Sequence, residues 1–146
     1  MLTEPEVRLV IPATHRHLNL VGAVVAELLA REEGLAEPQI VSYNVQLALQ
    51  EICANIVDHA YAGCGGQIEM VMAVLQTPWR LVIDLSDTGR PFNPETEVTP
   101  DLDEVHEGGY GLFLARALLD EVSYRIHAGR NHWHLVKQLE GDRNAA

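Results

Sequence analysis

Hydrophobic spacing in this sequence changes from helical to strand-like across one glycine-rich stretch, residues 62–66. Before it, apolar residues recur every three or four positions over residues 16–31 and 38–60, which is typical of amphipathic helices. After it, residues 67–75 and 79–86 show the short apolar runs of β-strands, and their brief connection predicts an antiparallel hairpin. Helices followed by paired strands favour an α+β fold over an alternating α/β fold.

The remaining segments extend this plan with one more helix and three more strands. The helix is predicted over residues 111–120, and the strands are predicted over residues 7–11, 121–127 and 132–139. We therefore expect a two-layer α/β sandwich of the α+β class, with a mostly antiparallel sheet and helices on one face. Residues 1–141 would form this single domain, and residues 142–146 a polar tail.

The predicted core is aliphatic, because 47% of the residues are hydrophobic while only 5% are aromatic. On the second helix one side should be buried. Its expected buried residues are Val41, Val45, Leu49, Ile52 and Ile56.

The charge of the chain limits its partners. Twenty-one acidic residues against ten basic ones give a formal net charge of -11 at pH 7, which repels a phosphate backbone and excludes nucleic acid as a direct partner. Lys137 is the single lysine, and it lies in no Walker-type or eukaryotic protein-kinase motif. A nucleotide would therefore have to be held without such a lysine.

Cysteine usage and the start of the chain indicate a cytoplasmic protein. Cys53 lies in a helical pattern and Cys64 in the glycine-rich stretch, without the paired spacing of a disulfide framework or metal site. No basic leader and no membrane-spanning apolar run is found, so we expect no membrane contact. His132 and His134 would share one strand face, but no acid or cysteine stands at ligand spacing beside them, so a zinc site is not expected.

Three polar residues on the second predicted helix are spaced four apart: Glu51, Asn55 and His59. This spacing places them in one line beside the buried side of the helix. An asparagine oxygen suits a hard cation such as Mg²⁺, and a glutamate can orient or deprotonate a nucleophile. The same pattern also fits an ordinary helix edge with partly exposed polar groups.

Two glycine motifs follow. Asp87-Thr88-Gly89 ends an apolar strand, where an acid has no packing role and a glycine permits either a sharp turn or close approach to a ligand. Gly108-Gly109-Tyr110-Gly111 leads into a helix, and its unhindered N–H groups could bind an anion or serve as a hinge. Between them, residues 90–110 are acidic and irregular, with three prolines, and we interpret them as a lid.

The order of these motifs resembles that of the bacterial anti-sigma factor serine/threonine-protein kinases, a branch of the fold shared by gyrase, Hsp90, histidine kinases and MutL. Residues 48–61, ALQEICANIVDHAY, resemble the N box of that branch. Residues 87–92 resemble its first glycine box, and residues 108–114 with 119–122 its second box and the strand after it. The resemblance covers nearly the whole chain and implies a histidine-kinase-like ATPase sandwich of the Bergerat type.

The resemblance also implies roles at the matching positions. Glu51 would be the general base toward the acceptor hydroxyl, Asn55 the Mg²⁺ ligand, and Asp87 the acceptor for the adenine amino group. Gly89 would allow close packing under the base. The phosphate-binding backbone would comprise Gly108, Gly109, Tyr110, Gly111 and Leu112. Pro91 departs from the wider superfamily, in which many members have a second glycine there.

The implied function is that of an ATP- and Mg²⁺-dependent serine/threonine protein kinase in a partner-switching module. Such a kinase phosphorylates a small anti-anti-sigma (STAS-type) protein and sequesters a sigma factor, and related kinases pair as homodimers. Two alternatives remain at this stage: a nucleotide-dependent binding module without phosphate transfer, and a detached histidine-kinase ATPase domain. Glu51 argues against the first, and the lack of a helix bearing a phosphoacceptor histidine argues against the second.

Overall fold

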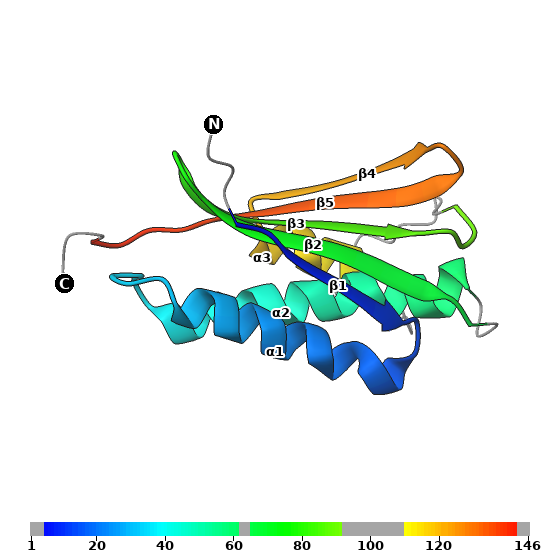
Figure 1. The fold of residues 1–146 in the computed structure, drawn as a ribbon, viewed down its shortest axis with the longest axis horizontal. Coiled ribbons are helices and arrows are strands. Elements are labelled where there is room, and N and C mark those ends of the chain that lie inside the picture. The colour runs from blue at the N-terminus through cyan, green and yellow to red at the C-terminus, as the bar shows by residue number, and fades with distance from the viewer. Residues whose placement is uncertain (1–4, 62–64, 92–109, 143–146) are drawn as a thin grey trace, which may run out of the picture.

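The computed structural model describes residues 5–61, 65–91 and 110–142, and it has two layers (Figure 1). One layer is a five-stranded sheet, and the helices of the described residues all lie on one of its faces. The strands are β1 (Val7–Pro12), β2 (Gln67–Gln76), β3 (Trp79–Asp87), β4 (Glu121–His127) and β5 (Arg130–Gln138). The α-helices are α1 (Leu18–Ala30), α2 (Pro38–Asn55) and α3 (Gly111–Leu118), and two short helices are η1 (His15–His17) and η2 (Ile56–Ala60).

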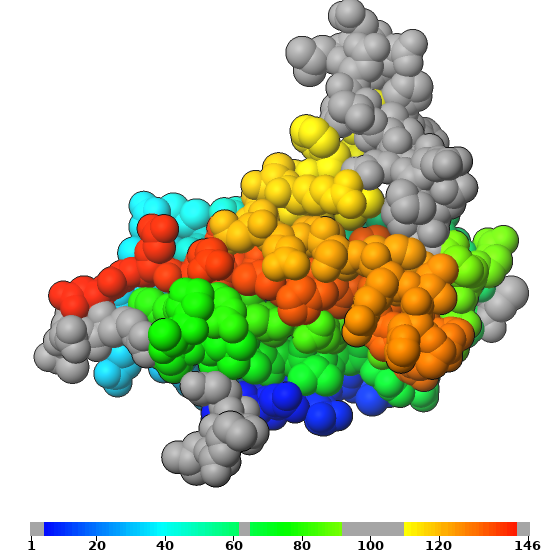
Figure 2. Space-filling view, turned by 90° about the horizontal axis from the view of Figure 1, so that it is seen from above, coloured from blue at the N-terminus to red at the C-terminus, as the bar shows by residue number. Residues whose placement is uncertain are grey.

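The strands follow the order β1-β2-β3-β5-β4, and each neighbouring pair is antiparallel. This confirms the predicted fold class. Figure 2 views the molecule from the sheet side, where β4 and the β2–β3 connection lie at the surface. The opposite face of the sheet packs on the helices.

The side chains of β3 alternate between the two faces of the sheet. Leu81, Ile83 and Leu85 point to the helices and are each at most 2% exposed. Because strand side chains alternate between faces, the next inward residue is Asp87, the last residue of β3. The pattern that fills the core therefore also buries an acid where the strand ends.

The helix layer is held by aliphatic packing. On α1 and α2 the buried residues are Leu18, Val21, Val25, Leu29, Val45, Ala48, Leu49, Ile52 and Cys53. Each fully buried leucine or isoleucine contributes roughly 1.5–3 kcal/mol relative to an exposed one. Val41, which we expected in the core, is only half-buried, because it lies in the first turn of α2, near the edge of the layer.

The second helix differs from its predicted form at its end. It is α-helical only to Asn55 and continues as a π-helical turn, η2, in which the Tyr61 N–H donates to the Ile56 carbonyl at 3.2 Å.

The third helix stops at Leu118 rather than residue 120, because Leu119 is already extended and leads into β4. β5 starts at Arg130 rather than residue 132, since Ala128 and Gly129 form a tight turn with φ of 51° and 74°.

No helix in the described parts of the chain is long and apolar enough to cross a membrane. After β5 the chain reaches the α1–α2 connection, where Leu35 and Gly141 form an isolated bridge and the Asp142 N–H donates to Gly34 O at 3.0 Å. Most of the segment interpreted as a lid, residues 92–109, lies outside the described residues.

Candidate functional site

Asp87 is one of the two polar residues that are buried in the described part of the chain. It is 1% exposed, yet its two carboxylate oxygens have different surroundings. Oδ1 accepts hydrogen bonds from the Gly89 N–H at 2.9 Å and from Asn131 Nδ2 at 2.8 Å. Oδ2 is buried and has no hydrogen-bond partner in the described residues. A buried carboxylate oxygen without a donor is costly, so Oδ2 is suited to accept a hydrogen bond from a ligand.

Gly89 packs directly against the end of the second helix. A β-carbon at this position would lie 2.5 Å from the Ala60 carbonyl oxygen and 2.6 Å from the Ala60 carbonyl carbon. Those atoms belong to the backbone and cannot rotate away, so only glycine fits. The Arg90 N–H continues this contact by donating to Ala60 O at 2.7 Å.

The π-turn is tied to β3 by two further side chains. The Arg90 guanidinium donates to the His59 carbonyl from Nε at 3.3 Å and from Nη2 at 3.1 Å. Tyr61 Oη accepts from the Thr88 N–H at 3.0 Å and donates to Gln67 O at 2.8 Å. Single π-turns occur frequently at functional sites, and here the end of the second helix is bonded to residues 88–90.

Glu51 and Asn55 lie one α-helical turn apart on α2, and both are half-buried. Because the π-turn starts only after Asn55, the four-residue spacing places these two side chains together as predicted. His59 lies inside η2, where that spacing no longer holds, and its side chain is exposed. In this structure it is the His59 backbone carbonyl that is used, as the acceptor for Arg90.

The start of α3 meets Glu51. A β-carbon at Gly111 would lie 2.5 Å from Glu51 Oε2 and 3.3 Å from Glu51 Cβ, so the two residues are in direct contact. The first-turn N–H groups of a helix have no intrahelical partner and attract negative charge. Tyr110 precedes this turn and is half-buried, and Leu112 directs its side chain into the core. Gly108 and Gly109 lie outside the described residues.

Asn131 is a site residue to which the sequence analysis assigned no role. It is 3% exposed and pairs with Asp87 across the β3–β5 ladder. Strand alternation carried a signal, since Asn131 is the polar member of an inward row that continues with the buried Trp133 and Leu135. Its partners, however, come from other strands and cannot be read from β5 alone.

Cys53 on α2 is buried. Burial raises the pKa of the Cys53 thiol to about 12, so this residue is a packing residue of α2 rather than a nucleophile.

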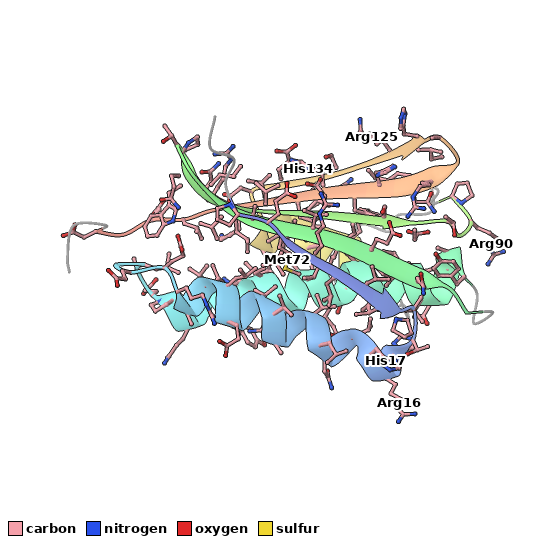
Figure 3. The ribbon with its side chains drawn as sticks, in the orientation of Figure 1. Arg16, His17, Met72, Arg90, Arg125 and His134 are labelled. Atoms are coloured by element: carbon pink, nitrogen blue, oxygen red, sulfur yellow. The ribbon has the colours of Figure 1, made fainter. Side chains whose placement is uncertain are left out.

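On the outer face of the sheet, His134 Nδ1 lies 2.7 Å from Asp84 Oδ1 (Figure 3). No acid stands at ligand spacing beside this histidine in the sequence, because Asp84 reaches it through cross-strand pairing. The described residues contain no group of three histidine, cysteine or acidic side chains that could hold a metal ion.

Comparison with known proteins matches residues 11–137 to the family model described as the histidine kinase-like ATPase domain. Among curated proteins, the serine-protein kinase RsbW of Bacillus pumilus (strain SAFR-032) is 29% identical over 82% of this chain and 77% of the relative. The RsbW of Bacillus licheniformis is 31% identical over 66% of this chain and 67% of the relative. The RsbW of Bacillus subtilis (strain 168) is 31% identical over 68% of this chain and 66% of the relative.

Two solved structures have the same fold. The RsbU and RsbW domains of Rv1364c from Mycobacterium tuberculosis give a TM-score of 0.66 at 22% identity, covering 92% of this chain and 32% of that longer one. The histidine kinase domain from the blue-light activated histidine kinase of Erythrobacter litoralis EL346 gives a TM-score of 0.56 at 17% identity, covering 88% of this chain and 62% of that one.

Proposed function

Because the chain belongs to the family of histidine kinase-like ATPase domains, we propose that it is an ATP-dependent serine/threonine protein kinase of the anti-sigma factor type. Its substrate is a serine or threonine of a small anti-anti-sigma (STAS-type) protein, and its second partner is a sigma factor. The names of the curated relatives, serine-protein kinases, support the transfer activity. The proposal places the protein in the cytoplasm, where both ATP and such partners occur.

The observation that carries the nucleotide assignment is Asp87 Oδ2, which is buried and has no hydrogen-bond partner among the described residues. Adenine presents an exocyclic amino group, which donates hydrogen bonds, whereas guanine presents a carbonyl oxygen at the same place. A buried carboxylate oxygen accepts from the first and repels the second, so the site favours ATP over GTP. Gly89, packed against the Ala60 backbone, holds the end of β3 close to the end of the second helix beside the proposed base site.

Asn55 and the start of α3 have the chemical groups that Mg²⁺ and a triphosphate require. Asn55 offers a neutral amide oxygen, a ligand that Mg²⁺ accepts, and the first turn of α3 at Gly111 offers backbone N–H groups. Mg²⁺ would neutralise charge on the phosphates. In the transfer step Glu51 accepts the proton of the acceptor hydroxyl while that oxygen bonds to the γ-phosphorus. The bond from the γ-phosphorus to the β–γ bridging oxygen breaks, and ADP leaves.

A nucleotide-dependent binding module would use the same base and phosphate contacts without transfer. The contact between Glu51 and Gly111 favours the kinase, since it places a carboxylate beside the start of α3, where the phosphates would bind. A module that only binds nucleotide needs no general base at that position.

Two substitutions on α2 test the proposal. Glu51→Gln keeps the size of the side chain but removes the base, so phosphate transfer should slow by about 10²–10⁴ while ATP affinity stays nearly unchanged. Asn55→Ala removes a metal ligand and should weaken binding of Mg-ATP as well as transfer. The measurements are single-turnover phosphorylation of candidate STAS-type proteins and a calorimetric titration of each variant. ATP binding by the parent protein without transfer to any candidate would favour the module, and undiminished transfer by Glu51→Gln would exclude this residue as the base.

A further inference from the structure

The side chain of Asn131 is fully engaged inside the protein. Its Nδ2 lies 2.8 Å from Asp87 Oδ1, 3.1 Å from Gly89 O and 3.2 Å from Arg90 O. Its Oδ1 accepts a hydrogen bond from Tyr124 Oη at 2.5 Å. Three oxygens on one side and a hydroxyl donor on the other fix which end of the amide carries nitrogen. Both ends of the Asn131 amide are therefore held by contacts within the protein.

These contacts determine how Asp87 presents its carboxylate. The Gly89 N–H and Asn131 Nδ2 both donate to Oδ1, so the rotation of the carboxylate is fixed with Oδ2 as the free oxygen. Without Asn131, Oδ1 keeps a single donor and the two oxygens become closer to equivalent. The Gly89 and Arg90 carbonyls would also lose the donor that holds the chain after β3 in place.

Tyr124 fixes the asparagine in turn. It lies on β4, its ring packs on Trp133 with centroids 4.8 Å apart, and its hydroxyl donates to Asn131 Oδ1 on the neighbouring strand β5. An amide that could turn over would place its oxygen against three acceptors, which the hydrogen bond from Tyr124 opposes.

We propose that Asn131, oriented by Tyr124, is a positioning residue for base recognition, which sets the carboxylate of Asp87 so that Oδ2 meets the amino group of adenine. This inference rests on the proposed nucleotide function and goes beyond it, because Asn131 and Tyr124 act without touching the base. The competing explanation is that the pair only stabilises the turn after β3. The two explanations differ in whether the pair affects recognition of the amino group itself.

The test compares ATP with purine riboside triphosphate, which differs from ATP only in lacking the amino group at C6. Both are titrated with Mg²⁺ into the parent protein and into Asn131→Ala, Tyr124→Phe and His134→Ala. His134 is the matched control, because it lies on the same strand but on the outer face of the sheet (Figure 3). We expect the parent and His134→Ala to favour ATP by about tenfold, the value of one buried hydrogen bond.

In Asn131→Ala the preference for ATP should fall to about twofold or less, while affinity for the analogue changes by less than about threefold. Tyr124→Phe should lie between this variant and the parent. If Asn131→Ala weakens both nucleotides equally and keeps the preference, the inference is wrong and the residue is only structural. Should Asn131→Ala not fold, Tyr124→Phe decides, and an unchanged preference overturns the inference. A parent protein that binds neither nucleotide would overturn the proposed function as well, which is a separate outcome.

Discussion

At the residue scale, the two oxygens of Asp87 have different hydrogen bonds, so a substitution at this position should change the affinities for ATP and GTP differently. In Asp87→Asn, the side-chain oxygen can keep the two donors now at Oδ1, which turns the new NH₂ group toward the base. A donor then faces the amino group of adenine, and ATP affinity should fall by about 1–3 kcal/mol. The same NH₂ group can donate to the carbonyl oxygen of guanine, so GTP should bind better relative to ATP than it does in the parent.

Calorimetric titration of both nucleotides into both proteins checks this prediction. The quantity of interest is the ratio of the ATP and GTP affinities, because a general loss of folding would lower both. Equal losses for ATP and GTP would contradict the assignment of Asp87 to the base.

At the scale of elements, the junction between η2 and the end of β3 depends on Gly89. Gly89→Ala would force a β-carbon against the backbone of Ala60. We expect the free energy of unfolding to fall by about 1–3 kcal/mol, as for other overpacking substitutions, and ATP affinity to fall with it. The measurements are urea unfolding and nucleotide titration.

Gly22→Ala, in the middle of α1, is the matched control for this substitution. Its β-carbon would lie 2.9 Å from Gln46 Oε1, which is the end of a flexible side chain and can move. Alanine also favours a helix interior over glycine by roughly 0.5–1 kcal/mol, so this variant should be as stable as the parent or more so. If both variants lose the same stability, the contact with Ala60 is not what requires glycine at position 89.

The sequence predicted the elements well where their determinants are local. Helical spacing over α2 was sufficient to place Glu51 beside Asn55, and the apolar run of residues 79–86 was sufficient to place Asp87 at the end of a strand. The π-turn escaped prediction because Ile56 and Val57 are both buried, so the apolar pattern does not show which hydrogen-bond spacing follows Asn55. The role of Asn131 and the Asp84–His134 pair escaped it because both depend on strand pairing between segments 44 and 50 residues apart.

At the scale of the whole molecule, charge should govern how nucleotide binding responds to salt and metal. The chain has a formal charge of -11, and ATP is also an anion, so the long-range interaction between them is repulsive. Removing Mg²⁺ with EDTA should weaken ATP binding by at least about tenfold, since Asn55 and the backbone alone leave the phosphate charge unneutralised. Raising NaCl from about 50 to 200 mM should recover part of that loss, because salt screens repulsion.

Calorimetric titrations with and without EDTA at the two salt concentrations measure both effects. The sign of the salt dependence is the informative result, since a protein that binds phosphates through basic residues loses affinity as salt rises. A loss of ATP affinity with rising salt would show that local cations, rather than backbone groups and Mg²⁺, dominate the site.

The direction of the strands separates the two ends of the domain. β3 and α2 finish at the end that carries Asp87, Gly89 and Asn55, whereas β1 begins and β5 finishes at the other end (Figure 1). Gly141 is held there against the α1–α2 connection by its bridge to Leu35. A module fused before β1 or after β5 would stand away from the proposed nucleotide site. A purification tag or fluorescent label added at that end would therefore leave the proposed nucleotide site accessible.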